Sequence, residues 1–247
     1  MSMFLKSAIA AAALAFMPVA TQAAQSVSIV SFTANQSGPT FTYTDNGVAG
    51  WTLTTGTPKN VLVTLEGFDG SFLSGIASRL TFTGSGTSFA QNTAANLWSQ
   101  AFTGGTVTFT SVGAFSFGST NYAANTNILT LNFSGGEMSA LVPGTSGNAL
   151  VSIPGDGFSG VTSDIFGFPP AFLTDFSITL ANVIPGFSIG QGGLGIQSNA
   201  RFTNFTARGS GDFTAAMVPE PGTWAMLLVG FGMVGFAARR RQAAVAA

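Results

Sequence analysis

The sequence contains no cysteine and no histidine among its 247 residues. Disulfide bonds, thiol chemistry and zinc sites built from Cys or His are therefore excluded, and a Ser-His-Asp catalytic triad is impossible. The lack of cysteine does not define the redox compartment. It is compatible with an oxidising exterior, where a free thiol would be a liability.

Charged residues are also scarce: they make up 7% of the chain, against roughly 25% in ordinary soluble proteins. The surface must therefore consist mainly of neutral polar groups, and Thr, Ser, Asn and Gly are abundant. Between the two ends of the chain acids outnumber bases. The bases there are Lys59, Arg79, Arg201 and Arg208. Because no basic patch exists to neutralise phosphates, we expect no nucleic-acid partner.

The first 23 residues resemble a secretory signal peptide. Lys6 supplies the short positive region, residues 8–16 form an apolar run, and Pro18 ends it before a stretch of small residues. Residues 21–23 fit a small-x-small cleavage site, which predicts a cut after Ala23. The chain is therefore expected to leave the cytoplasm.

The C-terminal end has three consecutive parts. An acidic turn between prolines, residues 219–221, is followed by the apolar run 224–238 and then by Arg239, Arg240 and Arg241. As a helix the run would span roughly 22 Å at about 1.5 Å per residue, somewhat less than a hydrocarbon core of about 30 Å. Under the positive-inside rule the arginines would stay on the cytoplasmic side. The pattern predicts a single transmembrane helix, and a permanent tail anchor is one interpretation of it.

The motif Pro219-Glu220-Pro221-Gly222-Thr223-Trp224-Ala225, with the apolar run and arginines behind it, resembles the PEP-CTERM sorting domain in its PEPxxWA form. The resemblance covers about the last 25 residues. It implies that Pro219, Glu220, Pro221, Trp224 and Ala225 form the recognition motif. It also implies that Arg239 to Arg241 form the stop-transfer cluster.

The same resemblance implies a Gram-negative bacterium with an exosortase, a membrane enzyme thought to cleave near the motif. The protein would pass through an inner-membrane intermediate and end at the cell surface or outside the cell. Such systems usually accompany exopolysaccharide, which makes exopolysaccharide a candidate partner. The bodies of these proteins vary widely, so the resemblance leaves the activity of the body open.

Between the two ends the apolar residues repeat with period two, which is typical of strands with one buried face. Asn46-Gly47 lies between two such runs and favours a hairpin, because a tight turn needs positive φ. Gly104-Gly105, Gly135-Gly136 and Gly192-Gly193 are predicted turns or loops. No internal helix of convincing length is indicated, and residues 92–102 are the best candidate for one. The predicted strands are 41–44, 51–54, 61–65, 80–83, 106–110, 114–117, 128–134, 149–153, 176–180 and 201–206.

Short strands separated by turn signals predict an all-β fold, an antiparallel β-sandwich or jelly roll. The expected organisation is a signal peptide at 1–23, an extracytoplasmic sandwich at 24–217 and the sorting tail at 218–247. Glycine- and proline-rich loops are predicted at 155–170 and 184–195. Apolar residues of the first loop would cap the sandwich or form a contact surface; they are Phe158, Ile165, Phe166 and Phe168.

Few residues suggest chemistry. Glu66 and Glu137 could be the carboxylate pair of a glycoside hydrolase, which requires two carboxyls facing each other. Asp69, Asp156 and Asp164 lie in glycine-rich stretches and could bind calcium, although no alternating-acid loop is present. An ordinary structural or solvent-exposed role is the alternative for all five. We therefore assign no catalytic residue, no metal site and no cofactor.

Aromatic residues could stack on sugar rings. Trp51 lies in a core-facing pattern, whereas Trp98 lies in a polar, loop-like stretch and is the candidate for glycan contact. The leading hypothesis is a non-enzymatic surface or matrix protein associated with polysaccharide in a biofilm. A secreted glycan-active hydrolase is the alternative. A self-assembling subunit whose strands pair edge to edge is a third hypothesis.

Overall fold

A computed structural model describes residues 25–35, 37–38, 40–94, 96–142, 149–168, 173–190, 200–217 and 230–231. Residues 26–218 form a compact unit that is separate from residues 1–25 and 219–247. The predicted signal peptide and almost all of the sorting tail therefore lie outside the described residues. Among the residues that are described, no helix is long and apolar enough to cross a membrane.

The body is built from strands joined by turns, and two 3-10 helices, Gly47–Ala49 and Gly155–Gly157, interrupt it. The prediction of an all-β fold is confirmed. The strands are β1 (Gln25–Ala34), β2 (Phe41–Asp45), β3 (Trp51–Thr54), β4 (Lys59–Glu66), β5 (Phe72–Gly86), β6 (Gln91–Ala94), β7 (Leu97–Ala101), β8 (Gly104–Ser111), β9 (Phe115–Phe117), β10 (Thr120–Tyr122), β11 (Asn127–Phe133), β12 (Glu137–Leu141), β13 (Ala149–Ile153), β14 (Phe158–Thr162), β15 (Leu173–Ile184), β16 (Ile189–Gly190), β17 (Arg201–Phe202) and β18 (Phe205–Met217).

Most strands belong to one 14-stranded hydrogen-bonded sheet with the order β14-β11-β8-β5-β3-β2-β18-β15-β13-β12-β7-β6. Strands β1 and β4 make a second connection, because β4 pairs with β5 and β1 pairs with both β4 and β18. The long strands β5 and β18 thus each bind two partners along one edge. The strand β5, for example, pairs with β4 through residues 72–80 and with β3 through residues 83–86.

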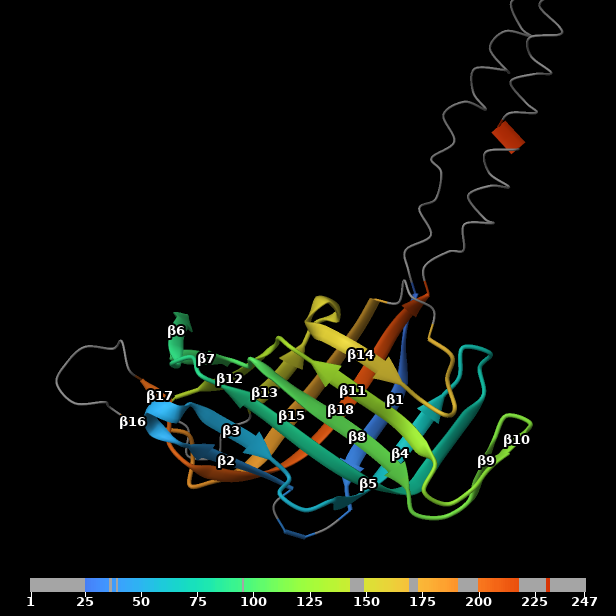
Figure 1. The fold of residues 1–247 in the computed structure, drawn as a ribbon, viewed down its shortest axis with the longest axis horizontal. Helices are drawn as coiled ribbons and strands as arrows, with labels where there is room; N and C mark the ends of the chain where they lie inside the picture. The colour runs from blue at the N-terminus through green and yellow to red at the C-terminus, as the bar shows by residue number, and fades with distance from the viewer. Residues whose placement is uncertain are drawn as a thin grey trace, which may run out of the picture. The chain divides into compact units, whose positions relative to one another are not determined.

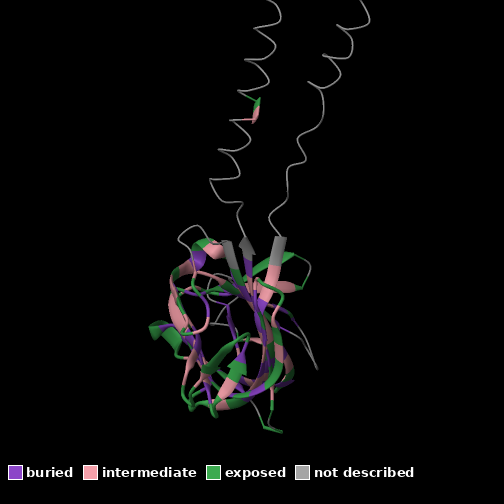
Figure 2. Cartoon of the chain, turned by 90° about the vertical axis from the view of Figure 1, so that its right-hand side faces the viewer, coloured by how far each residue is buried: buried purple, intermediate pink, exposed green. Residues whose placement is uncertain are grey.

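The sheet folds back on itself into two layers (Figure 1). The strands β14, β11, β8 and β5 lie in one layer, and β18, β15, β13 and β12 lie in the other. Buried residues occupy the space between the layers, and exposed residues lie on the outer sides (Figure 2). The body is therefore sandwich-like, and its described strand pairs are antiparallel.

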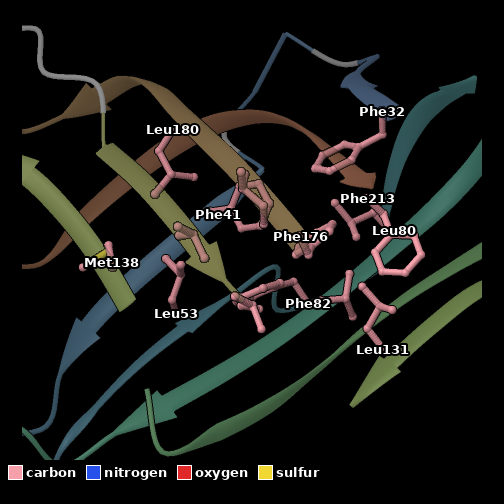
Figure 3. Packing of buried hydrophobic residues seen from close by; sticks show 14 of the residues in the cluster. Phe32, Phe41, Leu53, Leu80, Phe82, Leu131, Met138, Phe176, Leu180 and Phe213 are labelled. Atoms are coloured by element: carbon pink, nitrogen blue, oxygen red, sulfur yellow. The ribbon is translucent and has the colours of Figure 1, made fainter. Parts of the chain in front are cut away.

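The core is rich in phenylalanine, and the rings of Phe32, Phe41, Phe82, Phe176 and Phe213 meet between the layers (Figure 3). Edge-to-face and tilted ring pairs, such as Phe41 with Phe82 at 5.6 Å and Phe32 with Phe109 at 5.1 Å, are favourable for aromatic packing.

Inward-facing glycines make room for these rings. A Cβ at Gly84 would meet the ring of Phe102, and a Cβ at Gly211 would meet the ring of Phe32. A Cβ at Gly209 would likewise meet Phe41. Glycine weakens a strand on its own, but here it allows the strand backbone and a ring to approach closely.

The predicted hairpin is confirmed, since Thr42 pairs with Thr54 and Asp45 pairs with Trp51. The loop is longer than a two-residue turn. Gly47 has a φ of +62°, and the Asn46 N–H donates to the Gly50 carbonyl at 2.9 Å. The positive φ predicted from Asn46-Gly47 falls on the glycine, where it costs least.

Two local predictions are wrong. The candidate helix at 92–102 is the first: its described residues belong mainly to the hairpin strands β6 and β7, because β7 pairs with both β6 and β12. Gly104-Gly105 is the start of strand β8, opposite Gly84 and Ser85 of β5. The predicted turn at Gly135-Gly136 is confirmed, because it lies between β11 and β12. Gly192-Gly193 lies outside the described residues.

The apolar residues of the 155–170 segment pack on the core, as the capping interpretation predicted. Phe158 and Phe168 both contact the ring of Phe213, at 6.1 and 5.9 Å between centroids. Phe166 is buried and contacts Phe117 edge to face. Part of this segment is strand β14 and not loop, since it pairs with β11.

Candidate functional site

The residues of the predicted sorting motif and the arginine cluster, Pro219, Glu220, Pro221, Trp224, Ala225 and Arg239 to Arg241, lie outside the described residues. Their geometry is therefore not part of the site description. The last strand, β18, ends at Met217, two residues before the motif begins.

The two candidate hydrolase carboxylates lie on strands that are not neighbours. Glu66 ends β4 and pairs with Phe72, whereas Glu137 begins β12 and pairs with Ala101 and Ser152. Along the sheet, β1, β18, β15 and β13 lie between these strands. Both side chains are exposed. The sheet order thus does not bring them together as a catalytic pair would require.

The three candidate calcium ligands are also dispersed. The Asp69 carboxylate accepts the Ser71 N–H at 3.0 Å, and hydrogen bonds from Ser71 lower the pKa of Asp69. The Asp164 carboxylate accepts the Asn127 N–H at 2.8 Å, and Asp156 lies in the second 3-10 helix. Among the described residues, no three acidic side chains gather as a metal site would require.

Trp98 is half-buried and packs against the hydrophobic core. It lies on β7 opposite Ala140 of β12, and its neighbour Gln100 lies opposite Met138. Because Ala140 and Met138 are both buried, Trp98 belongs to the same inward side of the strand. Stacking of Trp98 on a sugar stays a prediction, and the ring is less open than the polar sequence around it suggested. Trp51 is buried, as expected.

A cluster of buried polar groups lies at the ends of β2, β7 and β17. The Tyr43 hydroxyl donates to Gln100 Oε1 at 2.9 Å, and Gln100 Nε2 donates to the Ser88 carbonyl at 2.9 Å. Burial, with a smaller contribution from the charge of Asp45, raises the pKa of Tyr43 well above its usual value. The phenol is therefore a fixed hydrogen-bond donor at neutral pH.

Arg201 adds a buried charge to this cluster. Only 7% of its side chain is exposed, its Nη1 lies 3.6 Å from Asp45 Oδ1, and its guanidinium sits 4.7 Å from the centre of the Phe89 ring. Nη1 has no hydrogen-bond partner among the described residues. Asp45 Oδ1 also accepts the Gly47 N–H at 3.0 Å. The cluster thus fixes the β2–β3 loop to β17, and sequence reasoning had assigned it no role.

The outer side of the layer that contains β14, β11, β8 and β5, and that continues over β3 and β2, carries rows of mostly hydroxyl side chains. One row crosses six strands, since Thr42 pairs with Thr54, Thr54 with Thr83, Thr83 with Thr106, Thr106 with Asn132, and Asn132 with Gly160. A second row joins Thr81, Thr108, Thr130 and Thr162. A third joins Thr44, Thr52 and Ser85. We call this surface, made of the side chains in the three rows, the threonine face.

Side chains on the threonine face are exposed or half-buried. Within the first row the Thr106 hydroxyl donates to Asn132 Oδ1 at 3.0 Å. In the second row the Thr130 hydroxyl donates to Asn127 Oδ1, which lies outside the rows, at 2.9 Å. Arg79, which pairs with Thr110, lies beside the second row. By contrast, the outer side of β15 and β18 carries Asp175, Arg208 and Asp212.

A shallow groove of about 340 Å³ lies on the threonine face, over β3, β5 and β8. Its lining residues are Thr52, Thr54, Thr83, Gly84, Ser85, Gly104 and Gly105. At Gly104 the position of a side chain is nearly vacant, because a Cβ there would meet only the Phe133 carbonyl oxygen, at 3.3 Å. The groove is therefore lined by hydroxyl side chains and glycine backbone.

Part of this surface was visible in the sequence and part was not. Alternating threonines predict hydroxyls on the outer side of each strand, one strand at a time. Whether the rows align depends on the register between strands that are distant in the chain. Because a turn was predicted at Gly104-Gly105, the first residues of β8, which line the groove, were not expected to be strand.

Comparison with known protein families matches the C-terminal end of the chain. Residues 218–241 match the family model described as the PEP-CTERM protein-sorting motif. No curated protein matches the chain, and no solved structure matches it either.

Proposed function

We propose that this chain, whose residues 218–241 are a PEP-CTERM protein-sorting motif, is an exported surface or extracellular-matrix protein released by an exosortase. The body would act as a non-enzymatic component associated with polysaccharide. The single observation that carries the proposal is the sorting motif, because it implies export and processing at a membrane. In this proposal Pro219, Glu220, Pro221, Trp224 and Ala225 are read by the exosortase, and Arg239 to Arg241 hold the tail on the cytoplasmic side.

The body supports a binding or structural role over catalysis. Glu66 and Glu137, the pair that a glycan hydrolase would need, lie on strands with four others between them in the sheet order. The threonine face offers neutral hydrogen-bonding groups, which suit a hydroxyl-rich polymer. The Gram-negative host and the biofilm setting belong to the proposal and rest on the motif.

The test is the intact mass and cellular fraction of the protein in its native host. Wild type is compared with Glu220→Ala, with an exosortase deletion and with Glu66→Ala, an exposed glutamate outside the motif. We expect wild type and Glu66→Ala to lose the residues beyond the motif. We expect Glu220→Ala and the deletion strain to accumulate an uncleaved inner-membrane form.

Persistence of the full tail in wild type, with all variants behaving alike, would contradict the proposal and leave a tail-anchored protein. Purified protein is then incubated with host exopolysaccharide. Depolymerisation that disappears in Glu66→Gln or Glu137→Gln would favour the hydrolase, whereas binding without turnover would favour the matrix component.

A further inference from the structure

We propose that the groove on the threonine face binds a neutral, hydroxyl-rich polysaccharide chain. This inference deepens the proposed function, on which it rests for the setting, by naming the site and the class of ligand. The groove of about 340 Å³ runs across three adjacent strands, from Thr52 and Thr54 on β3, over Thr83 and Ser85 on β5, to Gly104 and Gly105 on β8.

The chemistry of the groove matches sugar hydroxyls. Each threonine or serine hydroxyl can donate one hydrogen bond and accept others, which is also true of the hydroxyls on a sugar ring. Within a row, neighbouring side chains are separated by the strand spacing of about 4.8 Å. Successive rows are about 6.8 Å apart, the distance between same-side residues along a strand. A ligand with regularly spaced hydroxyls can therefore bond to several residues at once.

The absence of charged side chains in the groove disfavours charged polymers as ligands. No charged side chain lines the groove. Arg79 lies six residues before Ser85 on β5, with the outward-facing Thr81 and Thr83 between them. A polyanion would gain no ion pairs there and no counterion release. The occupant is therefore a neutral polymer, whose binding should change little with salt.

A protein partner fits the face poorly. The centres of protein interfaces are rich in aromatic residues, Met and Arg, and none of these occurs in the three rows. The described large apolar side chains that are exposed lie elsewhere; those in the body are Val48, Phe72, Phe89, Val112, Leu141, Leu150 and Ile184.

A small molecule fits poorly too, because such ligands need a pocket that encloses most of their surface. An extended chain can instead add many weak contacts along several strands.

The test is affinity electrophoresis of the protein purified from its host, in native gels that contain dextran, a mixed-linkage β-glucan or alginate. The key variant is Thr54→Val with Thr83→Val, because valine keeps the shape and β-branching and replaces each hydroxyl with a methyl group. The Gly56 N–H also loses its bond to Thr54 Oγ1, which is 3.0 Å long in the wild type. Thr179→Val is the matched control, since Thr179 is an exposed strand threonine on the outer side of β15. A third variant, Gly104→Val, fills the hollow.

We expect at least one neutral glucan to retard wild type and Thr179→Val equally. The double variant should lose on the order of tenfold in affinity, the effect of two hydrogen bonds, and Gly104→Val should lose a similar factor. Thermal unfolding should show all variants folded. The proposal fails if neither neutral glucan retards wild type, if only alginate does so in a salt-sensitive way, or if the control loses as much as the groove variants.

The outcome is separable from that of the sorting test. Normal tail cleavage without glucan binding would refute the groove and leave the sorting proposal standing. Glucan binding that depends on Thr54 and Thr83 in a protein whose tail is never cleaved would refute the sorting proposal and leave the groove standing.

Discussion

Arg201 and Asp45 form a partly buried ion pair in a chain that has few charged residues. The guanidinium is buried, one of its nitrogens lacks a hydrogen bond among the described residues, and its neighbouring carboxylate is about one-third exposed. Removing a buried charge from water is costly, and attraction to a partner repays that cost only in part. The pair is therefore better understood as a device that positions the β2–β3 loop than as a source of stability.

This account predicts an asymmetry between two variants. Asp45→Asn keeps the acceptor for the Gly47 N–H but leaves Arg201 as an uncompensated charge, so it should cost about 1–3 kcal/mol of unfolding free energy. Arg201→Met removes the charge and the unbonded N–H while retaining bulk against Phe89, so it should cost less than about 1 kcal/mol. Urea unfolding midpoints measure both. A larger cost for Arg201→Met would show that the guanidinium makes bonds beyond Asp45.

At the level of elements, glycine determines how closely the strands and the aromatic core approach. On β8 the two adjacent glycines face opposite ways. A Cβ at Gly105 would meet Thr83 backbone oxygen and the Phe133 ring, whereas a Cβ at Gly104 points toward the groove. Neither glycine has a positive φ, so their role is to provide space and not to turn the chain.

Gly105→Ala and Gly104→Ala should therefore differ in stability. The first substitution forces a methyl group against strand backbone and a core ring, and we expect a loss of about 2 kcal/mol or more. The second needs a shift of only a few tenths of an ångström at one carbonyl, and we expect a change within about 0.5 kcal/mol. Thermal unfolding of the two variants is the measurement. Equal destabilisation would contradict the assignment of Gly105 to the inward side.

At the level of the whole molecule, every described strand precedes the sorting motif. Residues 26–218 form the compact unit, and its last strand, β18, pairs with β15 up to Ala216. Strand β1, the first of the body, pairs with the same β18. Cleavage near the sorting motif would therefore leave every described strand of the sheet intact.

A protein truncated after Val218 should unfold at the same temperature as one that retains the tail, within about 2 °C, because no described strand loses a partner. Truncation after Thr203 should abolish cooperative unfolding, because it deletes β18 and exposes β15, β2 and β1. Differential scanning calorimetry compares the forms. A marked loss of stability in the first truncation would show that the tail contributes to the fold of the body.

The sequence alone was enough to predict the all-β class and most strands, because period-two alternation is local and each strand buries one side. It also identified the sorting motif, since that signal is a contiguous run of residues at 218–241. The hairpin at Asn46-Gly47 was predictable for the same reason: its signal is the φ preference of one residue.

Other features depend on contacts between distant segments, which no local pattern encodes. Within the segment 92–102, β7 is a strand because β12 pairs with it, and Gly104-Gly105 is strand because β5 lies beside it. Sequence suggested an exposed Trp98, but the pairing of β7 with β12 placed it on the inward side. The threonine face arose in the same way: alternation determined which residues point outward, and only the register of six strands aligned them, because register is set by tertiary pairing.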